Sequence, residues 1–315
     1  MDNPTHIIRW LLMLALSFSL LACSSVHSDN PGLQHLLVAR YGHAAAADSA
    51  RIYVFGGMTG HGISGDIEII DPRSGARQLL PEHTLPRRYH RAVWDGGHLI
   101  YLIGGQSVQQ TNADSPLPVE VFNTQTQQVT QQHWLPLNLK RPGVTRLGQQ
   151  LFVAGGSYLQ DDKLYLLDHV TLYRLDANQR RRTYALPDSR ETQLVSDRRR
   201  LYAVSGNDYE TPLQDLLMLD LGNAAAGWQT LTPPPHPLSA GSTVLRQQAI
   251  YVFGDFSQLD SVLRYDIQHD QWQSLALPFV GRYDSAAVLL NGVIYVIGGS
   301  RDYAGTPLDL IEAFD

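Results

Sequence analysis

Six apolar runs, each with an aromatic residue and each broken by small residues, recur along this chain of 315 residues. They occupy residues 52–57, 100–105, 151–156, 201–206, 250–255 and 294–299. Their aromatics stand at positions 53, 101, 152, 202, 251 and 295, so the gaps are 48, 51, 50, 49 and 44 residues. A period near 50 residues indicates a repeat architecture, in which each repeat forms one small unit of structure.

Each repeat predicts four short strands. The aromatic run is apolar on both faces, which is typical of a strand buried on both sides. A variable polar loop and a second strand follow, and that strand ends at an Asx residue that favours a tight turn. These residues are Asp71, Asn123, Asp176, Asp220, Asp266 and Asp315. One further strand follows, and another precedes each run. Six four-stranded antiparallel units predict an all-β propeller.

The pattern of Arg, small residues, aromatic run, Gly-Gly, variable loop and strand ending in Asp resembles the kelch repeat. In five repeats we align the arginine with Arg40, Arg88, Arg141, Arg190 and Arg282. The resemblance covers residues 33–315 and implies a six-bladed kelch-type β-propeller. The last repeat ends after its third strand, while the apolar segment 33–38 belongs to no repeat. We therefore expect this N-terminal segment to complete the last blade and close the ring, because closure satisfies free strand edges.

The first residues predict export. A short polar start, an apolar run of 12 residues and Leu20-Leu21-Ala22-Cys23 give the pattern of a signal peptide over residues 1–22. Cys23, the one cysteine of the chain, lies where the lipobox of bacterial lipoproteins has its acylated cysteine. Residues 23–32 would then be the lipidated cysteine and its tether. Ser24 follows the cysteine, which by this resemblance favours the periplasmic side of the outer membrane. The alternative is an ordinary signal peptide with a chance cysteine.

Charge and composition exclude some functions. The formal net charge of −6 argues against nucleic-acid binding, which needs a basic surface. The 12 histidines form no metal motif, so we expect no metal and no cofactor. We expect a monomer.

The candidate ligand site follows from the kelch resemblance, which places the loops before the first strand and after Gly-Gly on one face. We predict ligand-binding residues there, near the central channel. They are Arg40, Tyr41, Arg88, Tyr89, Arg141, Arg190, Arg282 and Tyr283. Guanidinium groups suit carboxylates or phosphates, and tyrosine faces suit sugars or peptide side chains. The alternative is that these arginines are structural parts of the repeat.

Two further clusters are possible sites. The acidic loop residues Asp208 and Glu210 are the catalytic candidates, against the alternative of solvated loop side chains. The runs Arg180–Arg182 and Arg198–Arg200 would meet on the opposite face and could attract an acidic partner or anionic lipid headgroups. The alternative for these arginines is a pair of solvated turns.

Three function classes follow from the resemblance. The first, which we favour, is a lipid-anchored binding or scaffold protein that recognises a protein or an anionic or carbohydrate ligand. The second is a sialic acid mutarotase; those enzymes have a Glu followed by an Arg in the fourth-blade loop, whereas this chain has Glu210 and no following Arg. The third, a copper radical oxidase, needs a cysteine crosslinked to a tyrosine. We exclude it because the single cysteine is Cys23.

Overall fold

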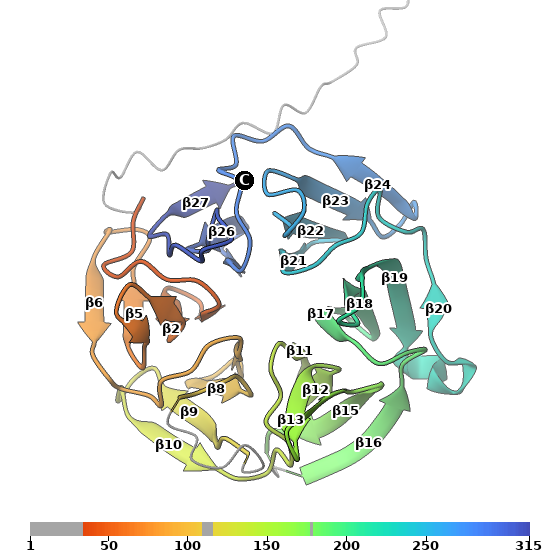
Figure 1. Ribbon diagram of the computed structural model, residues 1–315, viewed down its shortest axis with the longest axis horizontal. Helices are drawn as coiled ribbons and strands as arrows, with labels where there is room; N and C mark the ends of the chain where they lie inside the picture. The colour runs from red at the N-terminus through yellow and green to blue at the C-terminus, as the bar shows by residue number, and fades with distance from the viewer. Residues whose placement is uncertain (1–33, 109–115, 177–178) are drawn as a thin grey trace, which may run out of the picture.

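Six small antiparallel sheets surround a central channel in the computed structural model (Figure 1), which describes residues 34–108, 116–176 and 179–315. The first blade contains β1 (Ala44–Ala47), β2 (Ile52–Phe55), β5 (Ile67–Ile70) and β6 (Arg77–Leu80). The second contains β7 (Arg91–Trp94), β8 (Leu99–Ile103), β9 (Val119–Asn123) and β10 (Val129–Gln132). The third contains β11 (Gly143–Leu147), β12 (Gln150–Ala154), β15 (His169–Arg174) and β16 (Gln179–Ala185). The expected all-β, six-bladed propeller is confirmed.

The other three blades repeat this order. The fourth blade contains β17 (Glu191–Asp197), β18 (Arg200–Asn207), β19 (Pro212–Asp220) and β20 (Gln229–Thr230). The fifth contains β21 (Ser242–Arg246), β22 (Ala249–Phe253), β23 (Val262–Asp266) and β24 (Gln271–Ser274). The sixth contains β25 (Ala286–Leu290), β26 (Val293–Ile297) and β27 (Ile311–Phe314). One short 3₁₀ helix, η2 (Leu221–Ala226), precedes β20. The first strand of each blade lies nearest the channel, so the entering loops reach the centre.

The N-terminal segment completes the sixth blade. His35 forms an antiparallel bridge with Leu310, Leu36 N donates to Asp309 O at 2.6 Å, and Ile311 N donates to Gln34 O at 2.9 Å. Leu36 is buried in a core cluster with residues of the first and sixth blades. The expected ring closure is therefore present, although as one bridge rather than a regular strand. Leu33 and the expected signal peptide, Cys23 and tether lie outside the described residues.

The core consists of layers between neighbouring blades. Tyr53, Phe55, Ile100 and Phe122 form one such layer between the first and second blades. The Asx turns expected after the third strands occur: Asp71 Oδ1, for example, accepts a hydrogen bond from Arg73 N at 2.9 Å. These turns fix the hairpins, and the layers fix the angle between blades.

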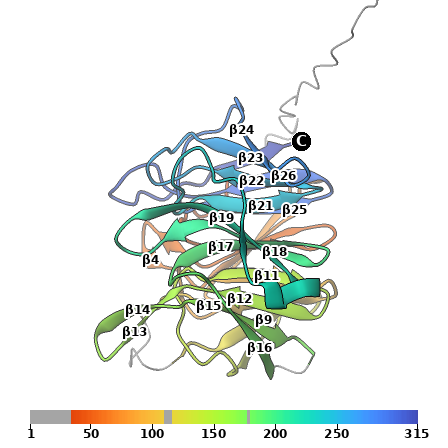
Figure 2. The same ribbon diagram turned by 90° about the vertical axis from the view of Figure 1, so that its right-hand side faces the viewer.

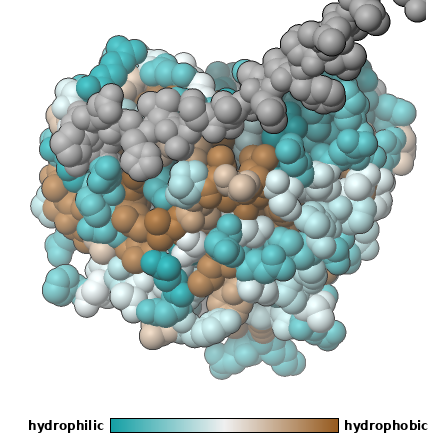
Figure 3. All heavy atoms as spheres, turned by 90° about the horizontal axis from the view of Figure 1, so that it is seen from above, coloured by the Kyte–Doolittle hydropathy of each residue, from teal (hydrophilic) through white to brown (hydrophobic). Residues whose placement is uncertain are grey.

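The loops between the second and third strands project on one side of the disc, where β4 (Gly62–Ile63) and the hairpin of β13 (Ser157–Gln160) and β14 (Lys163–Leu166) are visible in Figure 2. We call this side the loop face. The outer edge of the ring, seen from above in Figure 3, mixes hydrophobic residues on the left with hydrophilic residues on the right.

Candidate functional site

Four arginines that precede the first strands are buried inside their blades. Each reaches a carboxylate of the third strand of its own blade. The pairs are Arg40 with Glu68 at 3.9 Å, Arg87 with Glu120 at 2.8 Å, Arg190 with Asp215 at 2.7 Å, and Arg282 with Glu312. All four arginines are at most 1% exposed. The expectation that Arg40, Arg190 and Arg282 line the channel mouth is therefore wrong, because these side chains are buried beside carboxylates of their own blades.

The second blade corrects the alignment of the repeat. Arg87, not Arg88, occupies the buried position and donates to Gly104 O at 3.0 Å. Arg88 is half-buried and lies 3.3 Å from Gln106 Oε1 on the loop face. Two adjacent arginines made the sequence ambiguous, and burial decides between them.

The tyrosines of the expected arc have different environments. Tyr41 and Tyr283 are buried under loops, and Tyr283 Oη donates to Asp302 O at 2.8 Å. Tyr89 lies near the channel, where Arg141 stacks on its ring at 4.0 Å. Of the predicted ligand-binding residues, the structure brings Arg88 and Arg141 to the ring of Tyr89, at 4.9 and 4.0 Å from its centroid.

An inner ring of left-handed residues surrounds the channel. Its members are Gly42, Tyr89, Arg141, Ala240 and Asp284, with φ between 51° and 59°. Backbone hydrogen bonds join four successive pairs: Arg141 N to Tyr89 O, Tyr89 N to Gly42 O, Gly42 N to Asp284 O, and Asp284 N to Ala240 O, at 2.6–2.9 Å. Because non-glycine residues rarely adopt this conformation, the ring is a specific feature rather than a by-product of the turns. The fourth blade contributes no member to it.

The fourth blade lacks this residue because its entering loop is one residue shorter. In the first blade, Tyr41 forms a β-bridge with Met58, and Ala44 pairs with Phe55 at the start of β1. Two residues therefore lie between Tyr41 and Ala44. In the fourth blade, Glu191 and Gln193 hold the equivalent pairs, which leaves only Thr192. The shortening interrupts the inner ring between Arg141 and Ala240.

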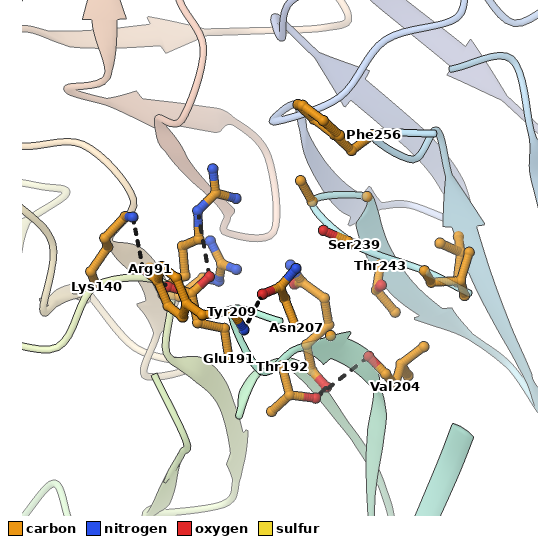
Figure 4. A pocket seen from close by; sticks show the side chains of 17 residues that line it. Arg91, Lys140, Glu191, Thr192, Val204, Asn207, Tyr209, Ser239, Thr243 and Phe256 are labelled. Carbon is orange, nitrogen blue, oxygen red and sulfur yellow. Dashed lines mark hydrogen bonds and ion pairs between the residues drawn. The ribbon is translucent and has the colours of Figure 1, made fainter. Parts of the chain in front are cut away.

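A cavity of about 330 Å³ lies at this interruption. Its lining comes from the second to the fifth blades and includes Arg91, Lys140, Arg141, Glu191, Thr192, Gln193, Asn207, Tyr209, Ser239, Ala240, Thr243 and Phe256. Figure 4 shows Lys140, Arg91, Glu191 and Tyr209 on one side and Ser239, Thr243 and Phe256 on the other. The missing residue thus leaves a hollow beside the channel.

The charges of this cavity are unequal. Three cations, Arg91, Lys140 and Arg141, line it with one carboxylate, Glu191. Arg141 is engaged, because it donates two hydrogen bonds to Asp284 at 2.6 and 2.7 Å and its Nε lies 3.8 Å from Glu191 Oε2. Arg91 has no carboxylate within 4.0 Å in the part of the chain that the structure describes; its Nη1 lies 3.4 Å from His90 O. Burial and the nearby Arg141 lower the pKa of Arg91 to about 10.

Tyr209 is the residue of the fourth-blade loop that reaches the cavity. Its hydroxyl donates to Glu191 Oε1 at 3.0 Å, accepts from Lys140 Nζ at 3.0 Å and lies 3.1 Å from Ser157 Oγ. The catalytic candidates on either side of it do not line the cavity. Asp208 accepts backbone hydrogen bonds from Glu210 and Thr211 in a turn, and these bonds lower its pKa. Glu210 is exposed, as the alternative of solvated loop side chains predicts.

On the opposite face, most described arginines of the two runs contact a neighbouring side chain. Arg199 pairs with Asp220 at 2.7 Å, Arg200 pairs with Asp197 at 2.5 Å, and Arg182 lies over the ring of Tyr184. The side chains of Arg180 and Arg181 lie outside the described part of the chain. These pairs match the alternative of solvated turns.

The described residues contain neither a cluster of metal-binding side chains nor a membrane-spanning helix. No group of three or more His, Cys, Asp or Glu side chains in residues 34–108, 116–176 and 179–315 could hold a metal ion. The same residues include no helix long and apolar enough to cross a membrane.

Sequence reasoning did not find Arg91, Lys140, Glu191 or Tyr209. One signal was present: Arg190 precedes its aromatic, Tyr202, by 12 residues, whereas Arg40 precedes Tyr53 by 13. Hairpin turns also vary in length, so the sequence cannot assign this difference to the entering loop.

Comparisons with known proteins agree with the fold. The family model described as "Kelch motif" matches residues 39–84 and 281–315, in the first and last blades. Human "Kelch-like protein 23" is 32% identical over 88 residues, or 28% of this chain and 15% of that protein. "Kelch domain-containing protein 10" of Xenopus laevis is 24% identical over 301 residues, or 83% of this chain and 71% of that protein.

One relative with an enzyme's name also matches. "N-acetylneuraminate epimerase" of Yersinia enterocolitica is 34% identical over 99 residues, which covers 27% of this chain and 25% of that protein. The matches to this protein and to Kelch-like protein 23 thus span a quarter or less of those relatives' length. The repeats, the six-bladed ring and the motif matches together identify the chain as a kelch-repeat β-propeller protein.

Proposed function

We propose that this kelch-repeat protein is a binding protein whose loop face recognises its partner through an anionic group, a carboxylate or a phosphate, in the cavity beside the fourth blade. The observation that carries the proposal is Arg91. It faces the cavity with no carboxylate in ion-pair reach among the described residues, while the four repeat arginines are all paired.

The energetics favour an anion there. Arg91 is desolvated and repelled by Arg141, which lowers its pKa to about 10. An anion beside it would compensate both effects, and a guanidinium binds a planar carboxylate or a phosphate through two hydrogen bonds. Lys140 adds a second cation at the edge of the cavity.

A thermal-shift titration tests this proposal. The protein is melted with increasing acetate, citrate, inorganic phosphate or N-acetylneuraminate at constant ionic strength. A ligand that binds only the native state raises Tm, and the rise grows with the ligand concentration. We expect at least one anion to raise Tm in the wild type and in the control Arg88→Gln, and none to do so in Arg91→Gln. Equal shifts in all three proteins, or no shift in the wild type, would contradict the proposal.

We further propose that the chain is exported and anchored through Cys23 to the periplasmic side of a bacterial outer membrane. The support is the lipobox-like sequence and the single cysteine. Several acyl chains on one residue would give stable anchoring, where one chain would not. In a diderm host, labelled palmitate should enter the wild type but not Cys23→Ser, and the variant should leave the membrane fraction. Unlabelled wild-type protein would refute the anchor.

A second candidate function is that of an N-acetylneuraminate epimerase, supported by the match to the Yersinia enterocolitica protein. A sugar acid presents a carboxylate, which suits Arg91. Exchange between the anomers of N-acetylneuraminate, followed by NMR, should then exceed the spontaneous rate and fall to it in Arg91→Gln. Exchange at the spontaneous rate with the wild type would leave the binding function alone.

A further inference from the structure

A second cavity, of about 390 Å³, lies next to the first on the loop face. It is lined from the second to the fourth blades by Gln106, Ser107, Asn138, Lys140, Ser157, Tyr158, Leu159, Leu164 and Tyr209. Lys140 and Tyr209 line both cavities, so these two side chains form the partition between them. A ligand that crosses this partition would occupy both cavities at once.

The two cavities have different chemistry. The first carries Arg91 and Arg141, whereas the hairpin β13–β14 gives the second an apolar wall. Leu159 and Leu164 of this hairpin are 47% and 45% exposed, which leaves much apolar surface in water. Tyr158 and Tyr165 stack with ring centroids 5.4 Å apart and brace the hairpin. The second cavity therefore suits an apolar side chain rather than another charge.

The partition is firmly held. Tyr209 Oη contacts Lys140, Ser157 and Glu191 at 3.0–3.1 Å, and Tyr209 has a left-handed backbone with φ 72°. A non-glycine residue adopts that conformation only when its surroundings enforce it. Because Tyr209 is 43% exposed, a ligand can pass over it without displacing it.

Most exposed large apolar side chains of the described residues lie on the loop face, and four of them, Leu159, Leu164, Tyr209 and Phe256, line these cavities. Nine large hydrophobic side chains are exposed among the described residues, and seven belong to loop-face loops: Val108, Leu159, Leu164, Tyr165, Tyr209, Phe256 and Tyr303. Aromatic and large apolar residues around a desolvated centre are typical of protein interfaces. A small anion would use none of this surface, which favours a polypeptide partner.

We propose that the loop face binds an extended segment of a partner protein at two points: an acidic side chain enters the first cavity beside Arg91, and an apolar side chain enters the second between Leu159 and Leu164. The segment crosses the ring of Tyr209. This inference rests on the proposed function for its acidic contact and adds the apolar contact and the class of partner. In an extended segment, side chains on one side alternate with those on the other, so the two anchors have a fixed spacing in the sequence.

The test is a selection from a displayed library of random dodecapeptides on the full chain. We expect enriched peptides to share an acidic residue and a Leu, Ile, Met or aromatic residue at one spacing. A synthetic peptide with this motif is then measured against the wild type, Arg91→Gln, the double variant Leu159→Ser/Leu164→Ser, and the control Leu37→Ser, which changes an exposed apolar residue that lines neither cavity.

The peptide variants show which cavity holds which side chain. Changing the acidic residue of the peptide to the amide should weaken its binding to the wild type about 10-fold, because the ion pair with Arg91 is lost. The same change should not weaken binding to Arg91→Gln, which lacks that ion pair. Changing its apolar residue to Ala should weaken binding about 10-fold to the wild type but not to the double leucine variant. Leu37→Ser should bind like the wild type.

Each other outcome is decisive. If only the acidic residue is selected and coupled to Arg91, the proposed function stands and the two-point site is wrong. If the selected peptides bind all variants equally, or if nothing is enriched on the wild type, the polypeptide site is refuted. The anion titration described above then decides separately whether the first cavity binds small anions.

Discussion

Arg141 of the third blade and Asp284 of the sixth blade form a bidentate ion pair, with hydrogen bonds of 2.6 and 2.7 Å, although 143 residues separate them in the chain. The third and sixth blades lie opposite one another in the ring (Figure 1), so this pair joins two sides of the channel. Burial disfavours the charge of Arg141, but Asp284 and Glu191 outweigh it and raise its pKa. The pair stabilises the centre of the ring. It also occupies the guanidinium of Arg141, a residue that lines the first cavity, so that this group is not available to a ligand.

The first prediction separates these two roles. Asp284→Asn removes one charge of a buried pair, which typically costs ~3–5 kcal/mol of unfolding free energy. It also releases Arg141 toward the cavity, so anion binding should become stronger while Tm falls. Denaturant unfolding and anion titration of the same variant measure the two effects. Loss of both stability and anion binding would show that Asp284 merely maintains the cavity.

The second prediction concerns Arg87 and Arg88, which are adjacent in sequence but not in environment. Arg87→Met strips Glu120 of its buried partner and should cost ~3–5 kcal/mol of unfolding free energy. Arg88→Met removes a half-buried contact to Gln106 and the contact with the ring of Tyr89, and should cost less than ~1 kcal/mol. Urea unfolding of both variants measures the difference. Equal costs would mean that the repeat position is assigned wrongly.

The third prediction tests ring closure with another adjacent pair. Leu36 is 4% exposed and Leu37 is 52% exposed. Leu36→Ala should cost ~2–5 kcal/mol because it leaves a cavity between the first and sixth blades. Leu37→Ala should change the unfolding free energy by less than ~0.5 kcal/mol. Deletion of residues 33–39 should destabilise more than deletion of the tether, and unchanged melting after it would disprove closure.

The fourth prediction is a loss of stability in acid. Burial, with Arg40 and Arg282, lowers the pKa of His43 to about 3, and burial lowers the pKa of His90 well below its usual value. Between about pH 6.5 and pH 3 the unfolded chain therefore binds more protons at these sites than the native one. The contribution of these two histidines to the unfolding free energy is complete above about pH 6.5. Below that pH it falls by ~1.4 kcal/mol per pH unit for each histidine. His43→Gln and His90→Gln should each reduce this slope by about one proton, measured by unfolding at several pH values; an unchanged slope would show that another group titrates.

Much of the fold follows from the sequence because it is periodic. The aromatic runs, the Asx turns such as that at Asp71 and the unassigned segment before Arg40 predict strands, turns and closure without any long-range information. The site does not follow in the same way. It depends on one residue that the fourth blade lacks beside Glu191, and a difference of one residue is hidden by variation in hairpin length. Asp208 and Glu210 were candidates because carboxylates can act in catalysis. Tyr209 between them is the residue that contacts Glu191 and Lys140 in the cavity.

The most direct test follows the Arg91 side chain itself. Its Nε–Hε resonance is recorded by NMR during titration with the same four anions, in the wild type and in a variant with one glycine inserted between Glu191 and Thr192. The insertion restores the length of the entering loop and should complete the inner ring and fill the cavity. The account predicts a saturable shift of this resonance in the wild type and none in the insertion variant. The same shift in both proteins, or no shift in the wild type, would contradict it.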